Sequence, residues 1–320
     1  MNKTSIAAQD RIVVGLPQER VEDMEQLFDT AAAIALQRGA SITLVHAISR
    51  APHLLPQVTD LTVEDDVRSA HTLLEAARRR LAAKVDCRTM INVVTSTQRP
   101  AAALVEQCEG ASLLLLRHRT LSVPRRILTG SITDVVAGQA SCPVMALHSN
   151  RVPTLGSVVV GVSPSGTSDA AVRLAFGEAS WRAVSLVAVQ AWDIPHGQMA
   201  YAWGHVPAED LADFRSAAEV NVAKALAALI TEYPDVPVER RVVRGPVAQN
   251  LLSCADKAQL MVVGRHRQAL LTSFGLGQVA RTLIAQAACP VIVAPVGSGS
   301  PASSAPQRDR EPAQVLAELT

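Results

Sequence analysis

The sequence is poor in aromatic residues, carries almost no net charge and lacks any long apolar run. Phe, Trp and Tyr make up 3% of its 320 residues, and the formal net charge is +1. A nearly neutral chain has no overall field that would attract nucleic acid or an anionic membrane. No apolar run approaches the roughly 20 residues of a membrane-spanning helix, and the N-terminus lacks the apolar stretch of a signal peptide. These absences predict a cytoplasmic protein with no nucleic acid and no membrane among its partners.

Cysteine and histidine show no spacing that is typical of a disulfide framework or a metal site. Five cysteines are present without a C-x-x-C pair, and the eight histidines include no H-x-x-x-H pair. The sequence also lacks G-x-x-x-x-G-K-(S/T) and G-x-S-x-G, so it has neither a P-loop nor a hydrolase nucleophile turn. We therefore expect no metal, no catalytic residue and no conventional enzyme.

What the sequence does contain is an internal repeat. Val-Val-Gly ends at Gly15 and again at Gly161, which is 146 positions later, and Cys-Pro-Val begins at Cys142 and again at Cys289, which is 147 positions later. A chain of this length exceeds the usual size of one domain. We expect one domain over residues 1–150, a second over residues 151–297, and a disordered Ser- and Pro-rich tail over residues 298–320.

Strands alternate with helices in both repeats. The expected strands are 11–16, 41–47, 87–95, 113–116 and 144–147, then 157–162, 184–191, 238–243, 259–263 and 291–294. The expected helices are 21–38, 64–84, one after residue 100 and one from residue 131, then 167–182, 208–231, 246–256 and 278–287. Such alternation implies right-handed crossovers and a parallel sheet. The predicted fold class is α/β, with two tandem, doubly wound, Rossmann-like parallel sheets of five strands, each with helices on both faces.

The loop after the fourth strand of each repeat is the candidate binding site. In open α/β sheets ligands bind beyond the carboxyl ends of the strands, and a helix N-terminus offers free N–H groups to phosphate. In the second repeat this loop starts at Gly264 and reaches Gly277 before a helix. In the first repeat Gly130 and Ser131 hold the corresponding place.

The element order, the glycines at positions 15 and 161, the Gly245-Pro246 turn, this loop and the Cys-Pro-Val strand starts together resemble the universal stress protein family. The resemblance covers nearly the whole chain up to Pro295, once per half. It implies the adenine nucleotide alpha-hydrolase-like fold, a regulatory or protective role under stress, and ATP or another adenine nucleotide as a ligand. ATP-binding members of the family carry G-x2-G-x9-G-(S/T) in the loop.

Each half departs from that motif. The four motif positions are Gly264, Arg267, Gly277 and Gln278 in the second half, and Arg117, Thr120, Gly130 and Ser131 in the first. The aspartate that follows the first strand in binders is replaced by Pro17 and Ser163. A side chain in place of glycine should clash with a triphosphate or redirect the loop. The resemblance also implies nucleotide contacts at Ala47, Ala191, Ile132 and Val279, which are otherwise ordinary packing positions.

Cations flank both loops, as Arg117-His118-Arg119 and Arg265-His266-Arg267. Arginine can hold phosphate where backbone amides cannot, so a modified anion site is one interpretation. A solvated charged loop is the other interpretation, and it is favoured. The two tripeptides align only when one residue is skipped, which weakens any claim that they are equivalent.

The leading functional hypothesis is a tandem universal stress protein. A scaffold that binds proteins but no nucleotide, and a slow ATPase or nucleotide sensor, are the alternatives. A dinucleotide-dependent oxidoreductase ranks last because Gly275-x-Gly277-x-x-Ala280 does not directly follow a strand. The last strands are apolar edges, which predicts that strands 144–147 and 291–294 join the halves as an intramolecular pseudo-dimer. A homodimer through these strands is left open.

Overall fold

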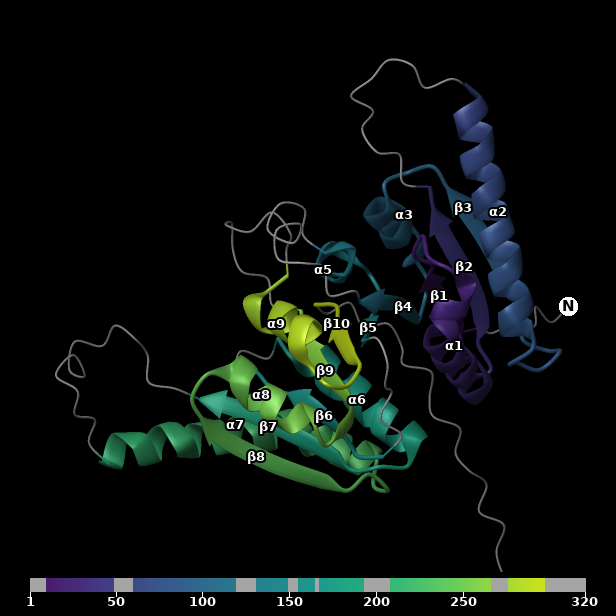
Figure 1. The fold of residues 1–320 in the computed structure, drawn as a ribbon. Helices are drawn as coiled ribbons and strands as arrows, with labels where there is room; N and C mark the ends of the chain where they lie inside the picture. Colours follow the sequence, from purple (N-terminus) through teal and green to yellow (C-terminus); the bar gives the residue numbers. More distant parts are fainter. Residues whose placement is uncertain are drawn as a thin grey trace, which may run out of the picture.

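The computed structural model describes residues 10–48, 60–118, 131–148, 155–164, 167–192, 208–265 and 276–296. Its centre is a ten-stranded sheet (Figure 1). The first half supplies β1 (Arg11–Gly15), β2 (Ser41–Ala47), β3 (Ile91–Ser96), β4 (Leu113–His118) and β5 (Val144–His148). The second half supplies β6 (Ser157–Gly161), β7 (Leu186–Trp192), β8 (Val238–Arg244), β9 (Ala258–Gly264) and β10 (Val291–Ala294).

The strand order is β3-β2-β1-β4-β5-β10-β9-β6-β7-β8. Within each half the order is therefore third, second, first, fourth and fifth strand, and all neighbours are parallel. The predicted α/β class and doubly wound parallel halves are confirmed. The two predicted sheets are continuous, however, because β10 pairs antiparallel with β5, Val291 facing Ala146 and Val293 facing Val144. The expected pairing of the last strands thus occurs within the chain.

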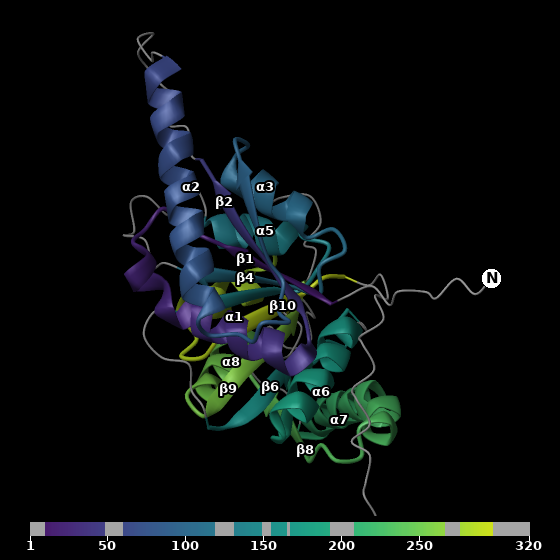
Figure 2. The same ribbon diagram turned by 90° about the vertical axis from the view of Figure 1, so that its right-hand side faces the viewer.

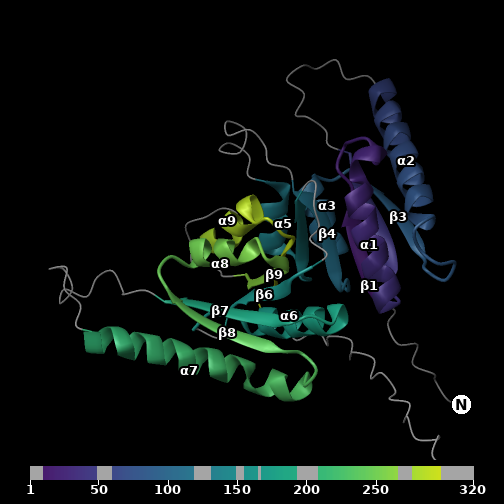
Figure 3. The same cartoon turned by 60° about the horizontal axis from the view of Figure 1, so that its bottom comes forward.

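Helices cover both faces of the sheet (Figures 2 and 3). One core contains residues of α1 (Glu25–Arg38), α2 (Asp60–Ala82), α6 (Asp169–Arg182) and α7 (Ala208–Glu232). The core on the opposite face contains residues of α3 (Pro100–Gln107), α5 (Ile132–Gln139), α8 (Val247–Ala255) and α9 (Gln278–Gln286). The central strands are buried on both sides, which explains why Leu113 to Leu116 form an unbroken apolar run. No helix in the described ranges is both long and apolar enough to cross a membrane.

Local chemistry sets the element ends. Helix α1 stops at Gly39, whose φ of 64° is left-handed and whose N–H donates to the carbonyl of Ala35. The predicted strand 87–95 was wrong at its start, since β3 begins at Ile91. The carboxylate of Asp86 accepts bonds from the N–H groups of Arg88 and Thr89 and so holds a turn there. The first turn of the predicted helix 21–38 is a 3-10 helix, η1 (Val21–Met24).

Two helix pairs join the halves in addition to the sheet. On one face, Arg38 of α1 pairs with Glu178 of α6, and its guanidinium lies 4.0 Å from the ring centroid of Trp181. On the other face, Arg281 of α9 lies 4.0 Å from the carboxylate of Asp134 in α5. The junction between the halves therefore extends through all three layers of the fold.

Candidate functional site

The candidate site lies where the first and fourth strands of a half end side by side. In this strand order the connection after β1 or β6 leaves to one face of the sheet, and the connection after β4 or β9 leads to a helix on the other. The space beyond the carboxyl ends of these strands, between the two connections, is the usual binding place in open α/β sheets. The chain has one such position per half, the first and the second crevice.

In the second half, Gly264 ends β9 and lies against the loop that follows β6. A Cβ atom built on Gly264 would meet the carbonyl oxygen of Thr167 at 2.8 Å. Ser168 Oγ accepts the N–H of Ser163 at 2.9 Å, and Thr167 Oγ1 donates to Ser163 Oγ at 3.2 Å. The predicted residues Ser163 and Gly264 therefore belong to one cluster. Gly264 is needed for the close approach of the loop, whether or not a phosphate binds there.

The N-terminus of helix α9 is the second feature of this half. Its N-cap residue is Gly277, with φ of −65° and ψ of 154°, and no side chain caps the helix. Gln278 is exposed and Val279 is half-buried in the first turn. The first N–H groups of such a helix are free to bind an anion. Arg267 lies outside the described residues, as do residues 266–275 in general.

In the first half, Arg117 of β4 fills the place that corresponds to Gly264. Its Nη1 donates to Glu19 Oε2 at 2.6 Å and to the carbonyl oxygen of Asp23 at 2.7 Å. Both charged side chains are mostly buried, with 20% of Arg117 and 13% of Glu19 exposed. The ion pair with Glu19 and the hydrogen bond to Asp23 therefore hold the segment after β1 against the end of β4.

Helix α5 of the first half starts at Ile132. Ser131 is its N-cap residue and is buried, but its side chain makes no capping bond, and Ile132 is half exposed, at 50%. The structure thus places a hydroxyl at the expected position. Gly130 and Thr120 lie outside the described residues.

The interpretation as a solvated charged loop was wrong for the two arginines that are described. Arg117 makes the ion pair above. Arg265 is 7% exposed, and its Nη1 donates to the carbonyl oxygens of Gly138 and Ala140, at 3.1 and 2.9 Å, at the end of α5. Neither residue belongs to a solvated loop. Arg119 lies outside the described residues.

The predicted base contacts, Ala47 and Ala191, are half-buried near the ends of β2 and β7. The residue after Ala191 is Trp192, whose ring stacks on Phe214 of α7 with centroids 6.4 Å apart. The Arg244 guanidinium lies 5.8 Å from the same ring. Sequence reasoning missed this group because Phe214 and Arg244 lie far from Trp192 along the chain. The first half has the buried Ile48 after Ala47.

Cysteine and histidine are the remaining candidates for chemistry in the described ranges. No cluster of three His, Cys, Asp or Glu residues there could hold a metal ion. Burial raises the pKa of the Cys289 thiol to about 12, so this thiol stays protonated near neutral pH. His46 is buried, and its Nδ1 lies 3.0 Å from the carbonyl oxygen of Leu16.

Comparison with known proteins agrees with this architecture. The model of the Universal stress protein family matches residues 10–148 and again residues 155–295. Universal stress protein Rv2005c of Mycobacterium tuberculosis is 31% identical over 297 residues, which cover 89% of this chain and 97% of that protein. A universal stress protein of Mycolicibacterium smegmatis is 30% identical over 280 residues, covering 82% and 90%.

A solved structure shares the fold over the same extent. The crystal structure of a universal stress protein from Archaeoglobus fulgidus has a TM-score of 0.68 at 16% identity, covering 91% of this chain and 98% of that one. Two matched domains, a tandem relative of equal extent and a common fold define the class. The chain belongs to the universal stress protein family and carries two domains of that family in tandem.

Proposed function

We propose that this chain is a cytoplasmic stress-response protein that binds one adenine nucleotide, in the crevice of its second half, and acts without conventional catalysis. The observation that carries the proposal is a difference between the two halves at one equivalent position, which is Gly264 in the second half and Arg117 in the first. Gly264 leaves the end of β9 without a side chain, whereas Arg117 at the end of β4 is bound to Glu19 and Asp23. Cysteines without disulfide partners among the described residues support the reducing compartment.

The first crevice is unsuited to a triphosphate. A ligand there would have to displace the Arg117–Glu19 ion pair, and breaking a mostly buried pair costs more than an exposed one. Glu19 would also bring a negative charge towards the phosphates. These two effects act against occupancy of the first half.

The second crevice combines three features that suit a nucleotide. The uncapped start of α9 at Gly277 suits phosphate. The hydroxyls of Ser163 and Thr167 can bond to sugar or phosphate oxygens. Ala191 lies beside the Trp192 group, where a base would reach. Gln278 replaces the hydroxyl of the family motif, and its amide can still donate a hydrogen bond.

Calorimetry on the full chain tests the proposal, with ATP, ADP, AMP and cyclic AMP as ligands. We expect one site per chain. Gly277→Asp should abolish binding, because it puts a carboxylate where the phosphate would lie, while aspartate is a good N-cap residue for α9. The matched control is Gly130→Asp at the corresponding position of the first half, which should bind as the parent does. Two sites per chain, or unchanged binding by Gly277→Asp, contradicts the proposal.

A scaffold without nucleotide is the second candidate, and one observation favours it. The Thr167 carbonyl already accounts for glycine at position 264. Absence of heat with all four nucleotides at millimolar concentration would support this candidate. A slow ATPase would instead show phosphate release that Gly277→Asp removes.

A further inference from the structure

The sheet has two outer edges, and they differ in charge. Because β5 and β10 pair with each other, the edges are formed by β3 and β8. Strand β8 has the sequence VERRVVR, and its Glu239 pairs with Arg241. Charged side chains on an edge strand prevent pairing with other chains. Strand β3 has the sequence INVVTS, without any charge.

Apolar side chains are exposed on β3 and just before it. Val93 is 38% exposed, and Met90, the residue before the strand, is 55% exposed. Ile91, Val93, Val94 and Thr95 are β-branched, and such residues favour strand pairing. An uncharged, β-branched edge is the kind that pairs with another strand unless something covers it.

Among the described residues, the hydrogen-bonding groups of β3 that do not bond to β2 lie at its odd-numbered residues. The carbonyls of Met90 and Ser96 accept the N–H groups of Ile42 and Ile48, so these even-numbered residues bond towards β2. In a parallel pair the bonding residues alternate along the strand. Ile91, Val93 and Thr95 therefore point their N–H and C=O groups away from the sheet.

We propose that β3 pairs antiparallel with β3 of a second copy of this chain. Pairing Val93 with Val93 of the second copy on a twofold axis matches outward N–H with outward C=O and puts Ile91 opposite Thr95. Both strands are neutral, so no like charges meet. The junction of β5 with β10 is an antiparallel edge-to-edge contact of the same kind inside the chain. The homodimer left open by the sequence would thus use the outer edge, since the last strands already have partners.

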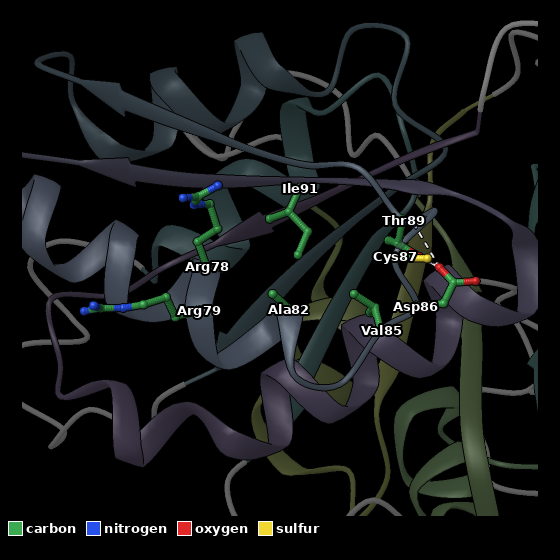
Figure 4. Close-up of a pocket in the computed structure, with 8 residues that line it drawn as sticks. All are labelled: Arg78, Arg79, Ala82, Val85, Asp86, Cys87, Thr89 and Ile91. Atoms are coloured by element: carbon green, nitrogen blue, oxygen red, sulfur yellow. Dashed lines mark hydrogen bonds between the residues drawn. The ribbon is translucent and has the colours of Figure 1, made fainter.

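A hollow beside β3 lies on the same edge (Figure 4). Its volume is about 560 Å³, and its lining includes the apolar side chains of Ala82, Val85 and Ile91 together with Arg78 and Arg79. In the antiparallel pair, the C-terminal end of β3 of the second copy runs towards this hollow. The contact would therefore extend from the strand to the last turns of α2.

Sedimentation velocity of the full chain at several concentrations tests this pairing. We expect a monomer–dimer equilibrium whose dissociation constant rises at least tenfold in Val93→Lys, which adds a charge at the axis. Thr95→Pro removes an outward N–H and leaves the bonds to β2 intact, so it should weaken the dimer with the fold preserved. The matched control is Arg240→Glu on the exposed edge of β8, which should dimerise as the parent does.

Circular dichroism and thermal melting establish that each variant is folded before its mass is interpreted. A parent chain that stays monomeric at high micromolar concentration overturns the proposal, and so does a dimer that survives in both folded β3 variants. If only one β3 variant folds, that variant alone decides the test: a weakened dimer supports pairing through β3, and an unchanged dimer overturns it.

Discussion

Asp134 of α5 and Arg281 of α9 occupy the same position in the two halves and face each other across the junction, with Oδ2 and Nε 4.0 Å apart. Their numbers differ by 147, which is also the separation of Cys142 and Cys289. In a symmetric dimer of identical chains, equivalent positions facing each other would carry the same charge. Here the duplicated halves have opposite charges at this position, which makes the contact attractive.

Reversing one of these charges should weaken the junction. We expect Arg281→Asp to lower the free energy of unfolding by about 1 kcal/mol, because it puts two carboxylates together where Arg281 is 43% exposed. Asp134→Arg combined with Arg281→Asp should recover part of the loss. Urea unfolding of the single and double variants measures the coupling. Strictly additive effects would show that the pair does not interact.

The pair between Arg38 and Glu178 should contribute far more to stability. Their side chains are 5% and 3% exposed, and Glu178 also accepts a bond from Arg182 at 3.1 Å. Burial lowers the pKa of Arg38, although the Glu178 charge opposes that shift. Glu178→Gln would leave a buried cation without its counter-charge and should cost about 3–5 kcal/mol in urea unfolding.

The control for that substitution is Glu219→Gln in α7. Glu219 pairs with Arg215, but both side chains are more than half exposed, at 52% and 66%. Its effect should stay within about 0.5 kcal/mol. A similar small effect for Glu178→Gln would mean that the α1–α6 contact does not depend on charge.

Stability should fall in mildly acidic solution because of His148. Its Nε2 lies 2.6 Å from the carbonyl oxygen of Ile284 in α9, and the His118 ring is 5.6 Å away. Burial lowers the pKa of His148, so the unfolded chain binds a proton more readily than the folded chain. The stabilisation is therefore complete above the unfolded pKa of about 6.5, and it is lost as the pH falls towards the folded value.

The measurement is the free energy of unfolding between pH 7.5 and 5.5 in the parent and in His148→Gln. The substitution should flatten the dependence on pH, because glutamine can donate to Ile284 without titrating. Parallel curves for the two proteins would assign the dependence to other groups.

Nucleotide binding in the second half should change the emission of Trp192. Trp192 follows Ala191 in the chain and its ring contacts Phe214 and Arg244, whereas Trp181 lies at the junction of α1 and α6. We expect ATP to alter the tryptophan emission of the parent and of Trp181→Phe, but to have a much smaller effect in Trp192→Phe. An undiminished emission change in Trp192→Phe would show that the base does not bind near the end of β7.

Much of the fold could be predicted because each strand and helix leaves a local signal. Strands such as Leu113 to Leu116 are apolar throughout, and Gly39 marks a helix end. Periodicity located β4 to within two residues at its end. The start of β3 was misplaced because the Asp86 turn depends on one side chain that bonds to two N–H groups.

The candidate site was predicted less completely. Motif positions pointed to Gly264 and Gly277, but the partner of Arg117 is 98 residues away in sequence, so no spacing rule could identify Glu19. Arg265 is the clearest case. Its Nη1 bonds to carbonyls 125 and 127 residues earlier, in the other half, and only the packing of the two halves brings them together.

The antiparallel ladder between β5 and β10 has a consequence during synthesis. A ribosome makes β5 long before β10, and at roughly 5–20 residues per second the delay is on the order of ten seconds. Throughout that interval one side of β5 in the nascent first domain would have no partner strand. Nascent chains on neighbouring ribosomes of one messenger RNA carry the same unpaired strand, so crowded translation would favour pairing between them. Completion of the second domain must then reverse this pairing.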